Sequence, residues 1–568
     1  MHTPSAHPPA VRPADHFARH LSWARRPALT NPLTLLLSLN PFARALAGKV
    51  NDTADAADAA NVGRADEAGE GGGRIAPLDR RVFAVSGVVF AVLMVLSSRY
   101  GFHRDELYFL DCARHLQASY VDQPALAPLL ARVSLSLFGV SAAGLRLWPA
   151  LAAAGTVVVG GLTARELGGA RRAQLLAAIA TGTMPVLLGS GHIANTTSYE
   201  MLAWAAIALV VVRIGRTGDT RWWLAAGALV GLGAEFNHLA AIFGTVVLAA
   251  ALLGPARRTV ADHRLFVGAV IAVLLMLPDL WWQARHGWPM FAMTRALNGE
   301  HGGAGNIVTW VVGQLGMSCL AMTVLWVVGL RFLWRAGRPL WRCLVPAYAV
   351  LFVLFAVTTG AQVYYLAGLY VCLLAAGAVG LDGWLHSRPD RLRGLLTGTA
   401  VSAALSAVIV LPVLPPSAVA WTYGTSAISG ETLGWPQLVG TVRQVWTRLP
   451  AEQRANAVIF AADYSEAGAI NELGRSAGLP TAASSQNTDW WWGPGNPHAT
   501  TVVAIAPGPR YAPGFETHLR QYFRHVRAAA TLSNPSGVHN IEWGGHVYLC
   551  TDPVRSLGSI WPELRNYA

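Results

Sequence analysis

The pattern of hydrophobic and polar positions divides the chain into three parts. Residues 1–78 are rich in Ala, Pro, Asp and Gly and contain no apolar run of spanning length, so we predict a disordered tail. From Val82 to about residue 415, apolar runs long enough to cross a bilayer recur. In residues 416–568, short apolar runs alternate with polar segments, which indicates a small soluble α/β domain.

The second part, residues 79–415, predicts an all-α membrane domain with eleven transmembrane helices, because its apolar runs are about 16 to 22 residues long. The predicted spans are 82–98, 143–163, 173–191, 198–213, 222–236, 238–254, 265–283, 308–330, 341–358, 363–384 and 395–414. The run 124–138 is shorter and contains Arg132, so we predict an interfacial helix there.

The distribution of arginine supports this count. With eleven spans, the loops on one face carry groups of three or four arginines, whereas the short loops on the other face hold only Arg285 and Arg295. The positive-inside rule places the arginine-rich face in the cytoplasm. We therefore predict a multi-pass protein of the cell membrane with a cytoplasmic N-terminus. The first outer loop (99–142) and the domain 416–568 would be extracytoplasmic.

Composition narrows the class of protein further. The chain is 53% hydrophobic and 13% charged, with a mean hydropathy of +0.38, which excludes an ordinary cytosolic enzyme. Its net charge of +12 lies largely in the predicted cytoplasmic loops, so we expect no nucleic-acid partner. Lys49 is the only lysine, which excludes a Schiff-base or phosphate-loop lysine in the folded part. The five cysteines lack metal-ligand spacing and no compact acidic cluster is visible, so we expect no metal and no cofactor.

The predicted C-terminal domain contains three strand-like runs and one helix-like run. The strands are expected at 457–461, 501–505 and 546–550, and the helix at 466–473. Three consecutive indoles, Trp490-Trp-Trp, stand in this domain. They either stack on sugar faces or pack inside the domain, and the sequence favours packing.

Polar side chains gather at the outer ends of the predicted spans, where buried charge is costly and therefore usually functional. Asp105 and Glu106 in the first outer loop are the sharpest candidates, because a partly desolvated carboxylate can act as a general base toward a hydroxyl. The alternative is that both acids only open the next helix. Asp122 likewise is either a site acid or a helix N-cap.

These motifs resemble a known family. Arg104-Asp-Glu-Leu-Tyr, followed by Tyr120-Val-Asp-Gln-Pro, is similar to the polytopic family-39-type glycosyltransferases of the GT-C superfamily, which include protein O-mannosyltransferases and aminoarabinose lipid A transferases. The resemblance covers about residues 80–568. It continues through further segments, namely Gly191-His, Glu235-Phe-Asn-His, 281–289, Tyr364-Tyr-Leu and 463–468.

The resemblance implies the GT-C fold and a transfer reaction at the outer face of the membrane. The donor would be a polyprenyl-phosphate-linked sugar, and the acceptor a hydroxyl of a glycan, lipid or protein. Asp105 would be the general base of an inverting transfer, Asp122 would orient the acceptor, and Glu106 would complete the catalytic set.

Further residues at the outer ends of the spans are predicted to bind substrate. They are Arg104, Tyr108, His192, Glu200, His238, Arg285, His286, Gln362, Tyr364 and Tyr365. Relatives often have lysine where this chain has His238 and Gln362. Because lysine is absent, the phosphate of the donor would be neutralised by an arginine or a histidine, namely Arg104, Arg285, His238 or His286.

Two other classes of protein fit parts of this pattern. A secondary transporter places its binding groups near the middle of the membrane, within repeated halves. Here the charges stand at the ends of the spans and no repeat is visible, which favours the glycosyltransferase. A non-catalytic membrane protein of cell-envelope assembly would fit the missing lysines.

Overall fold

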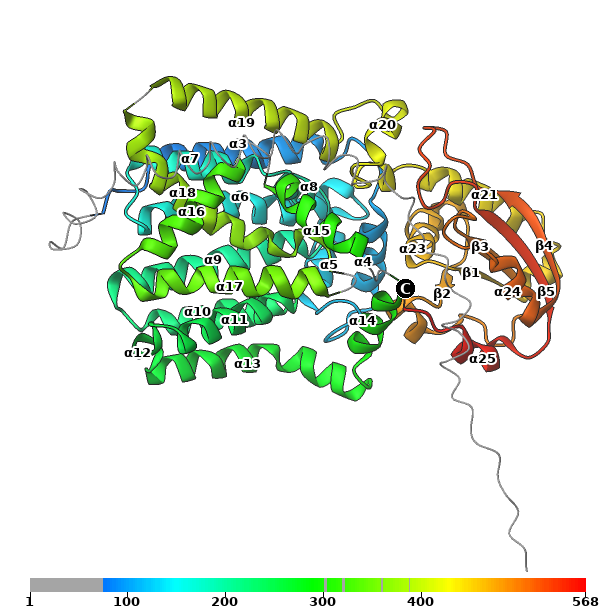
Figure 1. Ribbon diagram of the computed structural model, residues 1–568. Helices are drawn as coiled ribbons and strands as arrows, with labels where there is room; N and C mark the ends of the chain where they lie inside the picture. The colour runs from blue at the N-terminus through cyan, green and yellow to red at the C-terminus, as the bar shows by residue number, and fades with distance from the viewer. Residues whose placement is uncertain (1–74, 301–303, 319–321, 359–360, 388, 568) are drawn as a thin grey trace, which may run out of the picture.

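The protein is a bundle of long helices with a smaller sheet-containing domain packed against one end (Figure 1). The computed structural model describes residues 75–300, 304–318, 322–358, 361–387 and 389–567. The predicted tail, residues 1–78, lies almost entirely outside the described residues.

Six helices of the described residues are long and apolar enough to cross a membrane. They are α6 (Ala142–Glu166), α9 (Thr197–Thr217), α13 (His263–Arg285), α17 (Pro339–Val357), α18 (Ala367–His386) with the preceding turn η2 (Val363–Leu366), and α19 (Pro389–Val410). The pair α7 (Arg171–Gly182) and α8 (Pro185–His192) makes a seventh, bent by 57°. The bend falls where Pro185 starts α8, since proline restricts the residue before it and cannot continue a helix.

The remaining predicted spans fall on helices that are too short to cross by themselves. They are α3 (Arg80–Leu96), α10 (Trp222–Ala234), α11 (Leu239–Leu253), and the two helices α15 (Ala304–Met317) and α16 (Thr323–Arg335) in place of the run 308–330. The protein is thus mostly helical and membrane-embedded. Length and composition support six or seven of the eleven predicted spans.

The bundle helices approach closely at glycines. A Cβ atom on Gly227 of α10 would lie 2.0 Å from the carbonyl oxygen of Gly268 in α13. A Cβ atom on Gly377 of α18 would lie 1.8 Å from the carbonyl oxygen of Leu325 in α16. Small residues at such crossings are typical of helix packing in membranes, where backbones must come into contact.

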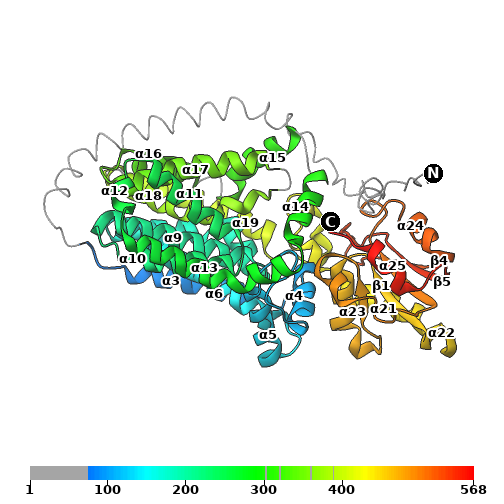
Figure 2. The ribbon, with the colours of Figure 1, turned by 90° about the horizontal axis from the view of Figure 1, so that it is seen from below.

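Three short helices lie at the end of the bundle that faces the C-terminal domain (Figures 1 and 2). They are α4 (Arg104–Arg114), α5 (Leu126–Phe138) and α14 (Pro289–Glu300). The 13 residues of α5 are too few to cross a bilayer, and its position at the interface stays a prediction. A fourth short helix, α12 (Arg257–Val260), lies at the opposite end of the bundle.

The C-terminal domain contains a five-stranded sheet of order β2-β1-β3-β5-β4. β1 runs parallel to β2 and β3, and β5 runs antiparallel to β3 and β4. The strands are β1 (Ala457–Ala461), β2 (Ala482–Ser484), β3 (Thr501–Ala506), β4 (Phe523–Thr531) and β5 (His546–Pro553). The helices are α20 (Ala420–Tyr423), α21 (Trp435–Thr447), α22 (Ala451–Ala455), α23 (Tyr464–Leu473), α24 (Phe515–Tyr522) and α25 (Leu557–Ile560).

Strands β1, β3 and β5 coincide with the three runs predicted from sequence, and α23 contains the predicted helix. The pattern missed β2, which has only three residues. It also missed β4, an edge strand whose pairing with β5 shifts between Ala528 and Ala530, so that its burial does not alternate regularly.

The C-terminal domain packs directly against α4. A Cβ atom on Gly468 of α23 would lie 2.7 Å from the backbone of Leu107, so the two helices pack in direct contact. One continuous hydrophobic core joins Phe109 and Leu110 of α4 to Ile470 of α23. This contact joins α4 to α23, which follows it by more than 300 residues.

Candidate active site between the helix bundle and the C-terminal domain

Two helix N-termini face each other at this junction, and each is closed by a capping box. In α4, the Glu106 carboxylate accepts a hydrogen bond from the backbone N–H of His103, the N-cap residue, at 2.7 Å. In α23, Glu466 accepts from the backbone N–H of Asp463 at 3.2 Å. Arg104 of α4 and Asp463 join the two ends through an ion pair of 2.5 Å.

Glu106 is fully buried, and both of its carboxylate oxygens accept hydrogen bonds. Its two carboxylate oxygens accept from the Arg146 guanidinium at 2.8 and 2.7 Å, and one of them also accepts from the backbone N–H of Ala194 at 2.8 Å. Arg146 donates its remaining hydrogen bonds to the carbonyl groups of Ser97 and Gly101. Glu106 therefore ties α4 to α6 and to the connection between α8 and α9, and it opens its helix as the alternative interpretation expected.

Asp105, the neighbouring acid, is in a different environment. Its side chain is 39% exposed. The Tyr464 hydroxyl of the C-terminal domain donates to Asp105 Oδ1 at 2.9 Å, and His103 Nδ1 lies 3.5 Å from Oδ2. The guanidinium of Arg104 lies over the Tyr464 ring at 5.1 Å. Asp105 is thus accessible to a substrate while its orientation is fixed by a residue of the other domain.

Asp122 lies in a tight turn beside the same tyrosines. The Tyr108 hydroxyl donates to Asp122 Oδ1 at 2.7 Å, and the Tyr108 and Tyr464 rings are 4.8 Å apart. Burial raises the pKa of Asp122 to about 6, and the negative charge of Asp105 adds to this rise. The interpretation of Asp122 as a helix N-cap is wrong, because α5 begins at Leu126.

A second polar group connects this turn to α13. Asp279, which is buried, accepts from the Ser119 hydroxyl at 2.6 Å and lies 2.9 Å from His238 Nε2. The Gln283 amide donates to the carbonyl of Tyr120 at 2.8 Å. His238, predicted to bind phosphate, is therefore engaged by a carboxylate.

The two cations at the C-terminal end of α13 differ in position. His286 stacks on Trp282 at 4.0 Å between ring centroids and meets the edge of Trp491 of the C-terminal domain at 4.8 Å. Arg285 is exposed and lies over the Trp281 ring at 4.5 Å. Among the described residues, no carboxylate lies within 4.0 Å of either cation.

The other predicted residues lie deeper in the bundle. Glu200, in the first turn of α9, is buried and accepts from the Asn237 amide at 3.0 Å. His192 is buried at the end of α8. Gln362, Tyr364 and Tyr365 belong to the segment around η2, where Tyr365 packs edge-on against Phe355 of α17.

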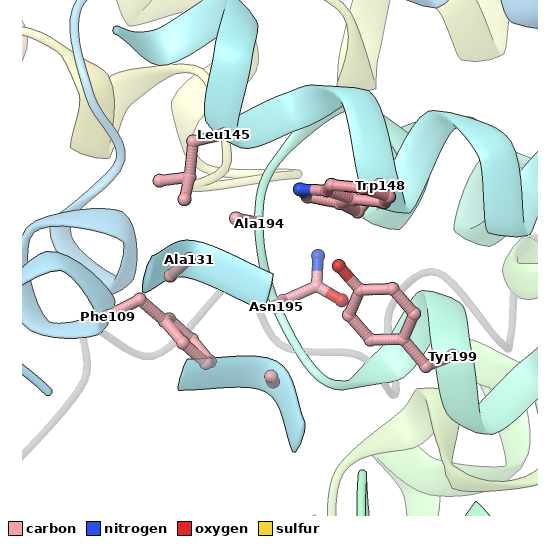
Figure 3. A pocket seen from close by; sticks show the side chains of 8 residues that line it. Phe109, Ala131, Leu145, Trp148, Ala194, Asn195 and Tyr199 are labelled. Carbon is pink, nitrogen blue, oxygen red and sulfur yellow. The ribbon is translucent and has the colours of Figure 1, made fainter. Parts of the chain in front are cut away.

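A small pocket lies beside α4 and adjoins a larger apolar cavity of the bundle. The small pocket lies between Phe109 of α4 and Leu145 and Trp148 of α6, with the Asn195 amide and the Tyr199 hydroxyl near the Trp148 ring (Figure 3). Trp148 and Tyr199 also line the adjoining cavity, which has a volume of about 340 Å³ and runs between α6, α9 and α10. All but a few of its lining atoms are apolar.

Sequence reasoning missed the partners of the predicted acids. Arg146 could have been identified from the sequence, because it is a charged residue within the apolar run 143–163 and such residues are rarely without function. For Tyr464 the sequence held no such indication beyond its place in the segment 463–468 that resembles the family. Within the described part of the chain, no three His, Cys, Asp or Glu side chains are arranged to hold a metal ion.

Comparisons with known proteins agree with this architecture. A family model described as dolichyl-phosphate-mannose-protein mannosyltransferase matches residues 122–282, which include Asp122, Glu200, His238 and Asp279. No curated protein matches the sequence of the chain.

Two solved structures share most of the fold. The first is ArnT from Cupriavidus metallidurans bound to undecaprenyl phosphate, with a TM-score of 0.57 and 16% identity over 83% of this chain and 98% of that one. The second is the arabinofuranosyltransferase AftD from Mycobacteria, with a TM-score of 0.50 and 16% identity over 85% of this chain and 40% of that one.

The chain has the fold of the GT-C membrane glycosyltransferases. Its resemblance to the protein O-mannosyltransferase-like group of that superfamily, predicted from the motifs around Asp105 and Asp122, is confirmed by the family model and by the structural similarity.

Proposed function

We propose that the protein transfers a sugar from a polyprenyl-phosphate-linked donor to an acceptor hydroxyl at the outer face of the membrane. The observation that carries this proposal is the setting of Asp105. It is a partly exposed carboxylate in a GT-C fold, held at 2.9 Å by Tyr464 between the bundle and the C-terminal domain. A carboxylate that is positioned and partly shielded from water is suited to general-base catalysis.

The reaction is a single inverting displacement. The acceptor oxygen attacks the anomeric carbon of the donor while its proton passes to the Asp105 carboxylate. The bond between the anomeric carbon and the phosphate oxygen breaks, and the polyprenyl phosphate departs as a monoester with that electron pair. Asp122, 2.7 Å from the Tyr108 hydroxyl, orients the acceptor. Glu106 holds α4 in place and takes no part in proton transfer, because all its acceptor positions are engaged by Arg146 and backbone N–H groups.

The charge that develops on the leaving phosphate requires cations. Arg104 already pairs with Asp463, and His238 lies against Asp279. His286 and Arg285 at the end of α13 are therefore the better suited of the four candidates. With cations from the chain itself in this role, transfer proceeds without a metal ion and is insensitive to EDTA.

The apolar cavity between α6, α9 and α10 receives part of the isoprenoid chain of the carrier. Two of these helices, α6 and α9, are of membrane length, and Trp148 and Tyr199 of the cavity also line a small pocket beside Phe109, one helical turn after Asp105. This arrangement requires α4 and the C-terminal domain to be extracytoplasmic. A periplasmic reporter fused after residue 420 is expected to be active, and a cytoplasmic signal would contradict the orientation.

The test is transfer of labelled sugar by the purified full-length chain in proteoliposomes. Undecaprenyl-phosphate-linked mannose, glucose and arabinofuranose serve as donors, with a total envelope extract as acceptor source. We expect one donor to yield labelled product with the inverted anomeric configuration, as determined by NMR. Uptake of free sugar into the vesicles without transfer would instead identify a transporter, and product with retained configuration would contradict the single displacement.

A further inference from the structure

The turn η6 (Asn487–Trp492) of the C-terminal domain packs against the end of α4 and the turn that follows it. The hydroxyl of Thr488 accepts a hydrogen bond from the backbone N–H of Val121, the residue before Asp122, at 2.9 Å. The Trp492 ring stacks on His115 at 4.3 Å and packs against Tyr108. η6 is therefore a wall of the candidate active site.

This turn carries an unusual number of buried polar atoms without partners. They are Asn487 Oδ1, Asp489 Oδ1, Trp491 Nε1 and Trp492 Nε1. The side chains of Asn487 and Asp489 are 4% and 3% exposed. Buried polar groups are nearly always hydrogen-bonded, because an unpaired one costs about 1–3 kcal/mol. Because indole N–H groups also lack partners in the helix bundle, the two oxygens of Asn487 and Asp489 are the atoms that point to partners supplied by a ligand.

The indole of Trp490, in the same turn, is hydrogen-bonded, whereas buried indoles of the helix bundle such as those of Trp204 and Trp223 are not. The Trp490 N–H donates to the carbonyl of Trp561 at 3.0 Å, and the indole of Trp561 donates back to the carbonyl of Trp490 at 2.9 Å. Trp491 and Trp492 lack such partners, although they are adjacent in sequence and only half-buried.

A cation without a counter-ion stands at the other side of the turn. The C-terminal tail pairs with the segment before η6, since Asn566 accepts from the backbone N–H of Asn487 at 2.9 Å. This pairing places the Arg565 guanidinium over the rings of Trp490 and Trp491, at 4.3 and 4.8 Å from their centroids.

Arg565 Nε is buried without a hydrogen-bond partner, and among the described residues no carboxylate lies within 4.0 Å of the guanidinium. Burial lowers the pKa of Arg565, with a smaller opposing effect from Tyr567. A free guanidinium fork matches the geometry of a phosphate group.

η6 thus offers hydrogen-bond acceptors and aromatic faces next to Asp122, and a cation on the side of His286. A glycosyl phosphate has the complementary layout, with a neutral ring rich in hydroxyl groups and an anionic group at one end. We propose that η6 and Arg565 form the surface that recognises the glycosyl-phosphate part of the donor. Asn487 and Asp489 accept from sugar hydroxyls, Trp491 and Trp492 contact the ring, and Arg565 binds the phosphate. This inference rests on the proposed function.

The experiment measures binding to the purified full-length protein by isothermal titration. The probes are farnesyl phosphate and farnesyl-phosphate-linked mannose, glucose and arabinofuranose. The variants are Asp489→Ala, Trp492→Phe and Arg565→Gln, with Trp421→Phe as the control because that ring is 84% exposed and remote from η6 in the sequence. Melting temperature is recorded for every variant.

We expect Asp489→Ala to lower the affinity for the preferred sugar-bearing probe about tenfold, which is the effect of losing one hydrogen bond to a charged or polar group. Its affinity for farnesyl phosphate should change less than twofold. Its melting temperature should stay the same or rise, because an unpartnered buried acid has been removed. Trp492→Phe should lower the affinity for the same sugar-bearing probe by a smaller factor. Arg565→Gln should lower the affinity for all probes, with and without sugar, by a similar factor.

Wild-type binding of both kinds of probe by Asp489→Ala would overturn the inference. So would a parallel loss of affinity and melting temperature, which would identify Asp489 as structural. If these variants bind normally while the wild type still transfers sugar, only the role of η6 fails. If the wild type neither binds nor transfers any sugar of the panel, the proposed function fails with it.

Discussion

The carboxylates on the two sides of α4 differ in how completely they are paired. On the bundle side, Glu106 is saturated by Arg146 and by backbone N–H groups. On the side of the C-terminal domain, Arg104 pairs with Asp463 and Arg114 pairs with the buried Glu472, but the nearby Asp489 has an oxygen with no partner. A buried acid that is paired with a cation usually has a structural role. A group of acids that outnumbers its cations is more typical of a site that binds substrate or exchanges protons.

The pKa values follow this difference. On the side of the C-terminal domain, burial raises the pKa of Glu466 to about 8, with the charge of Asp463 adding to the rise. Burial also raises the pKa of Asp489, to which the charges of Asp111 and Asp122 contribute. Glu466 therefore retains its proton near neutral pH, and the pKa of Asp489 is shifted in the same direction.

The largest effect that distinguishes the two sides is expected for Glu106→Ala. Removing one partner of a buried ion pair costs about 3–5 kcal/mol, so the melting temperature of the purified protein should fall sharply. The double variant Glu106→Leu with Arg146→Met should recover much of that loss. If Glu106→Gln instead melts like the wild type but fails to transfer sugar, Glu106 is catalytic and the comparison is wrong.

The next effect concerns the orientation of Asp105. Tyr464→Phe removes one hydrogen bond to a carboxylate, so we expect kcat to fall about tenfold with KM nearly unchanged. The melting temperature should change little, because the ring still packs against Tyr108. Tyr522→Phe on α24 is the matched control. Equal kcat values for Tyr464→Phe and the wild type would mean that the C-terminal domain does not position the base.

A smaller effect is expected in the pH profile. Asp122, whose pKa is raised to about 6, must be ionised to accept from the acceptor hydroxyl, so activity should rise as pH increases through 6. The folded protein holds this proton more tightly than the unfolded chain does. The contribution of Asp122 to stability therefore decreases as pH rises from about 4 to 6. Asp122→Asn should remove the change near pH 6 both from the plot of activity against pH and from the plot of stability against pH. If the change in activity remains in the variant, another group is responsible for it.

Much of the fold followed from local patterns, because apolar runs and strand-like alternation report directly on helices and strands. The points where helices bend or stop could not be predicted in the same way. The bend before Pro185 lies within a single apolar run, and whether a proline bends or ends a helix depends on its neighbours in space. The candidate acids were found because polar groups at the ends of spans are exceptional.

The partners of those acids were missed for a different reason. Tyr464 and Asp105 are 359 residues apart, and no periodicity within either segment encodes their contact. Which of two adjacent acids becomes structural was equally invisible, since it depends on whether Arg146 turns toward one or the other. The sequence could therefore identify the chemical groups of the site but not their pairing.

The central claim is that Asp105 accepts the proton of the acceptor. The most direct measurement compares kcat for sugar transfer by the wild type, Asp105→Asn and Asp390→Asn, whose side chain is 91% exposed at the start of α19. We predict that Asp105→Asn loses about 10²–10⁴-fold in kcat while its melting temperature and donor affinity stay within the range of the Asp390→Asn control. Transfer at the wild-type rate by a folded Asp105→Asn protein would contradict the account.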